Sequence, residues 1–310
     1  MTPPVPSLNG LYGMAQRRPL YSRVPALYFG APPWVKSIAR RWQAIRGGDV
    51  EGLIAQYLAH LASAPSGDGR PVPLLLTHDI DTAEGYANLP RLLEAEEALG
   101  LGSLNFIVTH RYAWDHGALA RLCARGHCFG VHDTTHDNRL PYLPVTQIRE
   151  RIRAAHDALG DLDCGAFRVP AFLRSAALYE GMPDCVRFDF SASDWALFWP
   201  HPGDGLETPH PLRHRGIVCV PTTLPRDGEM LALGLDGSID LWQQKMTQLW
   251  RVGAPAVALT HPDPGFTDSA ERIAVYAAML RWARDSGMFD LRPPADCLCE
   301  LERRADALSG

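Results

Sequence analysis

The chain has 310 residues, of which 46% are hydrophobic and 21% are charged, close to the averages for soluble globular proteins. This composition excludes a disordered chain, a collagen-like repeat and a long coiled coil. The 30 Lys and Arg residues against 35 Asp and Glu residues give a net charge of −5, and no run of five or more basic residues occurs, which argues against nucleic acid as a partner.

The sequence also bears on the compartment. No apolar run approaches the roughly 18 residues needed to span a bilayer. The first 20 residues lack the apolar segment of a secretory signal, so we expect a cytoplasmic protein. The seven cysteines are scattered without a Cys-x-x-Cys pair, which favours reduced thiols over a disulfide framework. Nothing in the sequence indicates an oligomeric state.

In chain order, residues 1–66 are predicted to form an N-terminal extension with a helix at about 50–61, and residues 67–310 a catalytic barrel. From residue 72 onward, short apolar runs alternate with amphipathic stretches. The predicted strands cover residues 73–77, 103–108, 128–132, 166–169, 186–190, 217–221 and 256–259. The predicted helices cover residues 89–99, 118–125, 145–159, 238–252 and 269–284. This alternation predicts a parallel sheet with helices outside it, and about seven such units fit an α/β barrel better than an open sheet.

Polar residues suited to metal binding follow two of the predicted strands. Asp79 and Asp81 come after the first strand, and His132 and His136 come at and after the end of the third. One helical turn would place the two imidazoles, four residues apart, on one face. Two His and one carboxylate, with positions left open for water and substrate, are typical of a hydrolytic or oxygenase metal site. Each pair alone is common in other settings; their joint placement at strand ends predicts the site.

With these motifs the chain resembles the polysaccharide deacetylase family, the NodB-like or family-4 carbohydrate esterases, over residues 71–290. Five segments are similar to the family's motifs, in the family's order: Leu76-Thr77-His78-Asp79-Ile80-Asp81, Gly126 to His136, Phe167 to Phe172, Phe188 to Trp195, and Val257 to Pro262. The resemblance implies a distorted (β/α)7-type barrel of parallel strands, the NodB homology domain.

The resemblance also implies a metal centre with a base beside it. Asp81, His132 and His136 would hold a divalent ion, most often Zn²⁺ in the family, with Co²⁺, Ni²⁺ or Mn²⁺ as alternatives. Asp79 would be the catalytic base and Arg168 would hold it. The chain departs from the family in motif one, where a residue separates the two aspartates.

By the same resemblance His261 would be the general acid. Either Asp189 or Asp194 would orient it, and we prefer Asp194 because a tryptophan follows it. The backbone N–H that binds the oxyanion in the family corresponds to Ala171, where the family's tyrosine is replaced by Ala171-Phe172. The expected substrate-binding residues are Ala171, Phe172, Trp195 and Arg139.

The expected function is therefore metal-dependent removal of an acyl group, in the first instance acetyl, from an acylated amino sugar or a related glycan intermediate. The expected lack of a signal favours a cytoplasmic substrate, such as a nucleotide-linked, lipid-linked or small soluble acyl sugar, over finished polymer. One alternative is a cyclic amide or ureide hydrolase of the same fold, against which the three metal ligands argue. Another is a non-catalytic carbohydrate-binding relative, against which the presence of Asp79 and His261 argues. The acyl group, the sugar and the choice between N- and O-linkage are left open.

Overall fold

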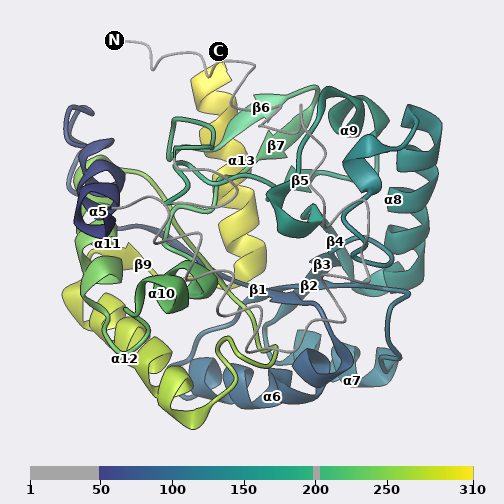
Figure 1. The fold of residues 1–310 in the computed structure, drawn as a ribbon, viewed down its shortest axis with the longest axis horizontal. Coiled ribbons are helices and arrows are strands. Elements are labelled where there is room, and N and C mark those ends of the chain that lie inside the picture. Colours follow the sequence, from purple (N-terminus) through teal and green to yellow (C-terminus); the bar gives the residue numbers. More distant parts are fainter. Residues whose placement is uncertain (1–48, 198–202, 310) are drawn as a thin grey trace.

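A curled, mostly parallel β-sheet with helices packed around it organises the chain (Figure 1). The structure is a computed structural model that describes residues 49–197 and 203–309; residues 1–48, most of the predicted N-terminal extension, lie outside the described part. The strands are β1 (Val72–Ile80), β2 (Leu104–Ile107), β3 (Cys128–Val131), β4 (Asp163–Phe167), β5 (Phe188–Asp189), β6 (Leu212–His214), β7 (Ile217–Cys219), β8 (Ala256–Thr260) and β9 (Phe289–Asp290). The α-helices are α5 (Val50–Ala59), α6 (Ala83–Glu97), α7 (His116–Ala124), α8 (Val145–Leu159), α9 (Ala176–Gly181), α10 (Asp227–Leu233), α11 (Asp240–Arg251), α12 (Ala270–Ser286) and α13 (Pro294–Ser309). Short 3-10 turns are η1 (Leu140–Tyr142), η2 (Gly160–Leu162) and η3 (Pro170–Phe172).

The predicted fold class is confirmed. The sheet order is β6-β7-β5-β4-β3-β2-β1-β8, with β9 also paired to β1, and every pairing is parallel except β6 with β7. All seven predicted strands and the six predicted helices are present. The prediction missed β6, β9, α9, α10 and α13; the two missed strands have three and two residues, too few to show a periodicity.

Alternate residues of the strands face the inside of the curled sheet, as the period of two in a strand requires. This inner core contains side chains from β1, β2, β4, β5, β7 and β8, and α13 contributes to it with one narrow stripe: Cys297, Leu298, Leu301 and Ala305. Leu75 of β1 belongs to this inner core, and Asp79 lies four residues after it on the same strand, so the alternation points Asp79 inward as well. The interior is thus apolar around α13 and polar at the carboxyl ends of the strands.

The outward residues form two further cores under the surrounding helices. One joins β1 and β8 to α5, α11 and α12, and the other joins β1 to β4 with α6 to α9. In Figure 1 these helices surround the sheet, with α11 and α12 on one side and α8 and α9 on the other. This arrangement leaves the loops after the strands to build a site.

The chain between β7 and β8 closes the curl without a regular ladder. Thr223 donates its backbone N–H to the carbonyl of Val257, and the Thr223 hydroxyl accepts the N–H of Val257. Helix α5 packs beside this junction, where the Tyr57 hydroxyl donates to the Thr223 carbonyl at 3.0 Å. Tyr57 and Leu61 are buried in the same core as α11, so α5 packs directly on the barrel. The domain division at residue 66 stays a prediction.

Within the described residues, no helix is both long and apolar enough to cross a membrane. In the same part of the chain all seven cysteines are free thiols, as their scatter predicts.

Candidate active site

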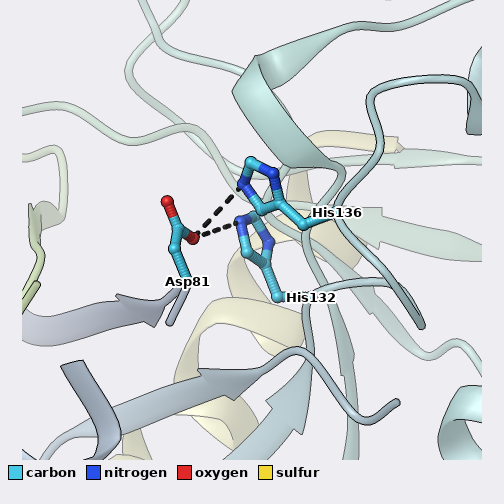
Figure 2. A group of neighbouring side chains, drawn as sticks. All are labelled: Asp81, His132 and His136. Carbon is cyan, nitrogen blue, oxygen red and sulfur yellow. Dashed lines mark ion pairs between the residues drawn. The ribbon is translucent and has the colours of Figure 1, made fainter. Parts of the chain in front are cut away.

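Asp81, His132 and His136 come together where β1 and β3 end (Figure 2). Oδ1 of Asp81 lies 3.4 Å from Nε2 of His132 and 3.2 Å from Nε2 of His136. The three candidate ligand atoms lie within 4.8 Å of one another. The sheet explains this, because β3 pairs with β2 and β2 with β1 in parallel, so the ends of all three strands lie at one edge.

The predicted helical turn between the two histidines is wrong. Residues 132–139 form an irregular loop in which Asp133, His136 and Asn138 have positive φ angles of 68°, 54° and 59°. A left-handed conformation costs a non-glycine residue about 1 to 2 kcal/mol, although Asp, Asn and His tolerate it better than most. The loop therefore juxtaposes the imidazoles by a folded-back path that their spacing alone does not reveal.

The imidazole of His132 is held in a defined orientation. Its Nδ1–H donates a hydrogen bond to the carbonyl oxygen of Arg168 at 2.8 Å. This contact leaves Nε2 to face Asp81, the arrangement typical of metal-binding histidines. Burial alone would lower the pKa of His132, but Asp79 and Asp81 outweigh it and raise the pKa.

The cluster fits a divalent cation. Oδ1 of Asp81 is buried and has no well-aligned hydrogen-bond donor in the described part of the chain. Burial would raise the pKa of Asp81, yet His136 and His132 hold it well below its usual value, so the carboxylate is ionised. One carboxylate and two imidazole nitrogens form a donor set suited to Zn²⁺ and similar ions, with room for further ligands.

Asp79 lies beside this cluster and is paired with Arg168 as predicted. Nη1 of Arg168 donates to Oδ1 of Asp79 at 2.7 Å, and Nη2 donates to the hydroxyl of Thr77 at 3.0 Å. The guanidinium is fully buried and lies 4.3 Å from the ring centroid of Phe106. Burial would raise the pKa of Asp79, but Arg168 and the neighbouring His132 and His261 lower it, so Asp79 is a carboxylate at neutral pH.

His261 directly follows β8, and its imidazole faces Asp79. Its Nε2 lies 3.9 Å from Oδ2 of Asp79, and its Nδ1 donates to Oδ1 of Asp227 at 2.8 Å. Oδ2 of Asp227 accepts the backbone N–H of His261 and the hydroxyl of Thr267. Burial would lower the pKa of His261, but Asp227, with Asp81 and Asp79, raises it to about 9. The ring is also stacked on Phe266, with centroids 4.6 Å apart.

The predicted contact between Asp194 and His261 is therefore wrong. Oδ2 of Asp194 instead accepts from Nζ of Lys245 at 2.7 Å and lies 3.0 Å from Nε2 of His60. Lys245 lies on α11 and His60 directly follows α5, so this carboxylate is bound by side chains from two helical segments. Burial lowers the pKa of Lys245, and Lys245 in turn helps to lower that of Asp194.

The other acid considered for this role, Asp189, also faces elsewhere. It accepts hydrogen bonds from the hydroxyls of Tyr179 and Ser191, and burial raises its pKa. The acid that does meet His261, Asp227, was missed. A signal for it exists in the sequence, because Pro-Arg-Asp-Gly at residues 225–228 closely follows a predicted strand, where site residues are expected.

The four predicted substrate-binding residues have different surroundings. Ala171 lies in a turn with φ 55° and ψ 20°, three residues after Arg168, and Phe172 is buried with its ring 4.8 Å from the guanidinium of Arg226. Trp195 is half-buried and stacked on His60 at 5.3 Å, and Arg139 is exposed at the end of the 132–139 loop. Their binding of substrate stays a prediction.

A second acid missed in the sequence links the two sides of the site. Asp263, two residues after His261, accepts the backbone N–H of Asp81 at 3.0 Å and the hydroxyl of Thr82 at 2.6 Å. A Cβ at Gly85 would lie 2.5 Å from this carboxylate, so the glycine provides the space that Asp263 occupies. Through this hydrogen bond Asp263 connects the backbone at Asp81 to the loop that carries His261.

No family model matches this sequence, and no curated protein is similar to it in sequence. Solved structures do share its fold. A putative polysaccharide deacetylase from Mycobacterium smegmatis aligns with a TM-score of 0.58 at 14% identity, covering 79% of this chain and 94% of that one. Puue allantoinase aligns at 0.57 and 11% identity, with coverages of 78% and 95%. A probable polysaccharide deacetylase from Pseudomonas aeruginosa PAO1 aligns at 0.53 and 12% identity, with coverages of 76% and 92%. The chain therefore has the fold of polysaccharide deacetylases, which an allantoinase shares.

Proposed function

We propose that this protein is a metal-dependent hydrolase that removes an acyl group, in the first instance acetyl, from the nitrogen of an acylated amino sugar or related glycan intermediate. The observation that carries this proposal is the meeting of three candidate metal ligands with a paired Asp and a paired His. These groups come from three different strand ends of a fold found in polysaccharide deacetylases.

Asp81, His132 and His136 are the residues that would hold the ion, with Zn²⁺ as the first candidate. A divalent ion held by these residues would polarise an acyl carbonyl and lower the pKa of a bound water. The ionised state of Asp81 and the Nδ1 contact of His132 prepare these ligands for binding.

Asp79 is the proposed base. A general base must be ionised and oriented, and the hydrogen bond from Arg168 does both. The 3.6 Å separation of Asp79 Oδ2 from Nε2 of His132 puts the carboxylate next to the metal ligands. From there Asp79 would accept a proton from the attacking water.

His261 is the proposed acid. A pKa of about 9 keeps its imidazole protonated at neutral pH, so Nε2–H can be given to the departing nitrogen. Asp227 holds Nδ1–H and stabilises the charge, as a carboxylate does for a catalytic imidazole in other hydrolases. The backbone N–H of Ala171 is the proposed donor to the oxyanion, and Phe172, Trp195 and Arg139 are proposed to line the substrate site.

The test combines metal content with acyl release. Purified protein is analysed for bound metal by mass spectrometry, and acetate release is measured on a panel of N- and O-acetylated sugars with and without a chelator. About one divalent ion per chain and chelator-sensitive release support the proposal. Asp79→Asn should lower turnover by about 10² to 10⁴-fold while leaving substrate binding intact.

The shared fold with an allantoinase calls for a second arm, with allantoin as a cyclic ureide substrate. Ring opening by metal-free protein, without acetate release, would replace the deacetylase proposal. Sugar binding that Asp79→Asn leaves unchanged, without any turnover by the wild type, would instead indicate a carbohydrate-binding protein.

A further inference from the structure

The loop that carries both histidine ligands is held by one side chain from a neighbouring helix. Arg151, on α8, donates from Nε and Nη2 to the two oxygens of Asp133 at 2.7 and 2.6 Å. It also donates from Nη1 and Nη2 to Asp137 at 3.1 and 2.8 Å, and from Nη2 to the Thr135 hydroxyl at 2.7 Å. A single guanidinium thus binds three side chains between residues 133 and 137.

The position of these contacts matters because His132 and His136 alternate with them along the loop. Asp133 directly follows His132, and Asp137 directly follows His136. The loop has no regular secondary structure, and three of its residues have positive φ. The carbonyls of Asp133 and Thr134 accept the backbone N–H groups of Thr109 and His110, and the Arg151 contacts add to these hydrogen bonds in fixing the loop.

Arg151 acts on the chain that carries the imidazoles and not on the imidazoles themselves. The two acids could have accepted hydrogen bonds from the histidine ring nitrogens, which is a common arrangement around metals. Here the carboxylate of Asp133 is fully buried against Arg151, while Nδ1 of His132 is bound by the Arg168 carbonyl. The planar fork of a guanidinium can span two carboxylates in a fixed geometry, which a lysine ammonium cannot do.

We infer that Arg151 is a positioning residue that sets the placement of His132 relative to His136 and thereby the affinity of the centre for a divalent ion. This inference rests on the metal site of the proposed function. It concerns binding of the ion, so it can be tested without knowledge of the substrate.

The experiment measures binding of Zn²⁺ and Co²⁺ to the metal-free full-length protein by calorimetry, together with the visible absorption of the Co²⁺ form. Arg151→Gln should weaken binding by about 10- to 100-fold, as loss of partners that orient ligands usually does, and should alter the Co²⁺ spectrum. The metal affinity of Arg151→Lys should lie between that of Arg151→Gln and that of the wild type. The matched control is Arg153→Gln, an exposed arginine on the same helix, which should leave affinity and spectrum unchanged.

Thermal unfolding of the metal-free proteins separates positioning from general stability. A lower Tm for Arg151→Gln with unchanged affinity and spectrum would overturn the inference and leave Arg151 a structural residue. If Arg151→Gln does not fold, Asp137→Asn is tested instead, because it weakens only the ion pair between Arg151 and the half-exposed Asp137. A metal affinity of Asp137→Asn equal to that of the wild type would then overturn the inference. A wild-type protein that binds neither ion would refute the metal site and this inference together, whereas unchanged affinity in the variants refutes the inference alone.

Discussion

Replacing Asp227 by Asn tests the acid half of the proposed mechanism most directly. The pKa of His261 is raised from 6.5 to about 9, and after burial, which opposes the rise, Asp227 makes the largest contribution. This rise in the pKa corresponds to about 3 kcal/mol of preference for the charged imidazole, shared among Asp227, Asp81 and Asp79. Asn keeps the shape and one acceptor but removes the charge.

The consequence for activity follows from protonation. At pH 7.5 an acid with a pKa of about 9 is about 97% protonated, whereas at its ordinary value of 6.5 only about 9% would be protonated. The active form is the protonated one, so activity is lost as pH rises through the pKa. We expect Asp227→Asn to move the alkaline limb of kcat/KM downward by at least about one pH unit. At pH 7.5 the loss of rate follows the protonated fraction of His261 and reaches its limit of about tenfold only if the pKa returns to 6.5, with recovery in more acidic buffer.

The assay is the pH profile of acyl release between about pH 5.5 and 10, with Tm recorded for each variant. Asp194→Asn is the matched control, because Asp194 was the acid expected from the sequence yet binds Lys245 and His60. It should lower stability without moving the alkaline limb. An alkaline limb that stays in place in Asp227→Asn, or that moves in Asp194→Asn, would refute the assignment of Asp227.

Three other outcomes are expected. His132→Gln, like dialysis against a chelator, should reduce acyl release at least about 100-fold, and Zn²⁺ should restore only the dialysed wild type; full activity in the chelator would contradict the metal site. Gly85→Ala and Asp263→Ala should each weaken Zn²⁺ binding. In the double variant the loss of binding free energy should be much smaller than the sum of the two single losses, because removing the carboxylate makes room for the new methyl group. Additive losses in calorimetry would show that the two positions are independent. Lys245→Met should lower the free energy of unfolding by about 3 to 5 kcal/mol, because it leaves the Asp194 carboxylate buried without its ammonium partner. Since the pKa of Asp194 is lowered by folding, the stabilisation from this carboxylate is present near neutral pH and is lost as pH falls through the lowered pKa, which urea titrations at several pH values can measure.

Much of the architecture was set by local patterns in the sequence. Short apolar runs alternating with amphipathic stretches gave seven parallel strands and the helices between them, because burial on a sheet and burial on one helix face impose different periods. Helix α13 was missed although Cys297, Leu298, Leu301 and Ala305 recur at helical spacing and form its stripe on the inner core. The ligand candidates Asp81, His132 and His136 were found because parallel strands bring their carboxyl ends to one edge.

Tertiary structure decided the contacts that give these residues their properties. Asp227 lies 34 residues before His261, and they meet only because the chain closes the curl between β7 and β8. Asp194 precedes a tryptophan, as the family motif suggests for the orienting acid. In the fold, however, its carboxylate binds His60 beside α5 and Lys245 of α11. A sequence states which groups can ionise or bind a metal; which charge lies against which depends on packing, because electrostatic attraction falls with distance and grows when water is excluded.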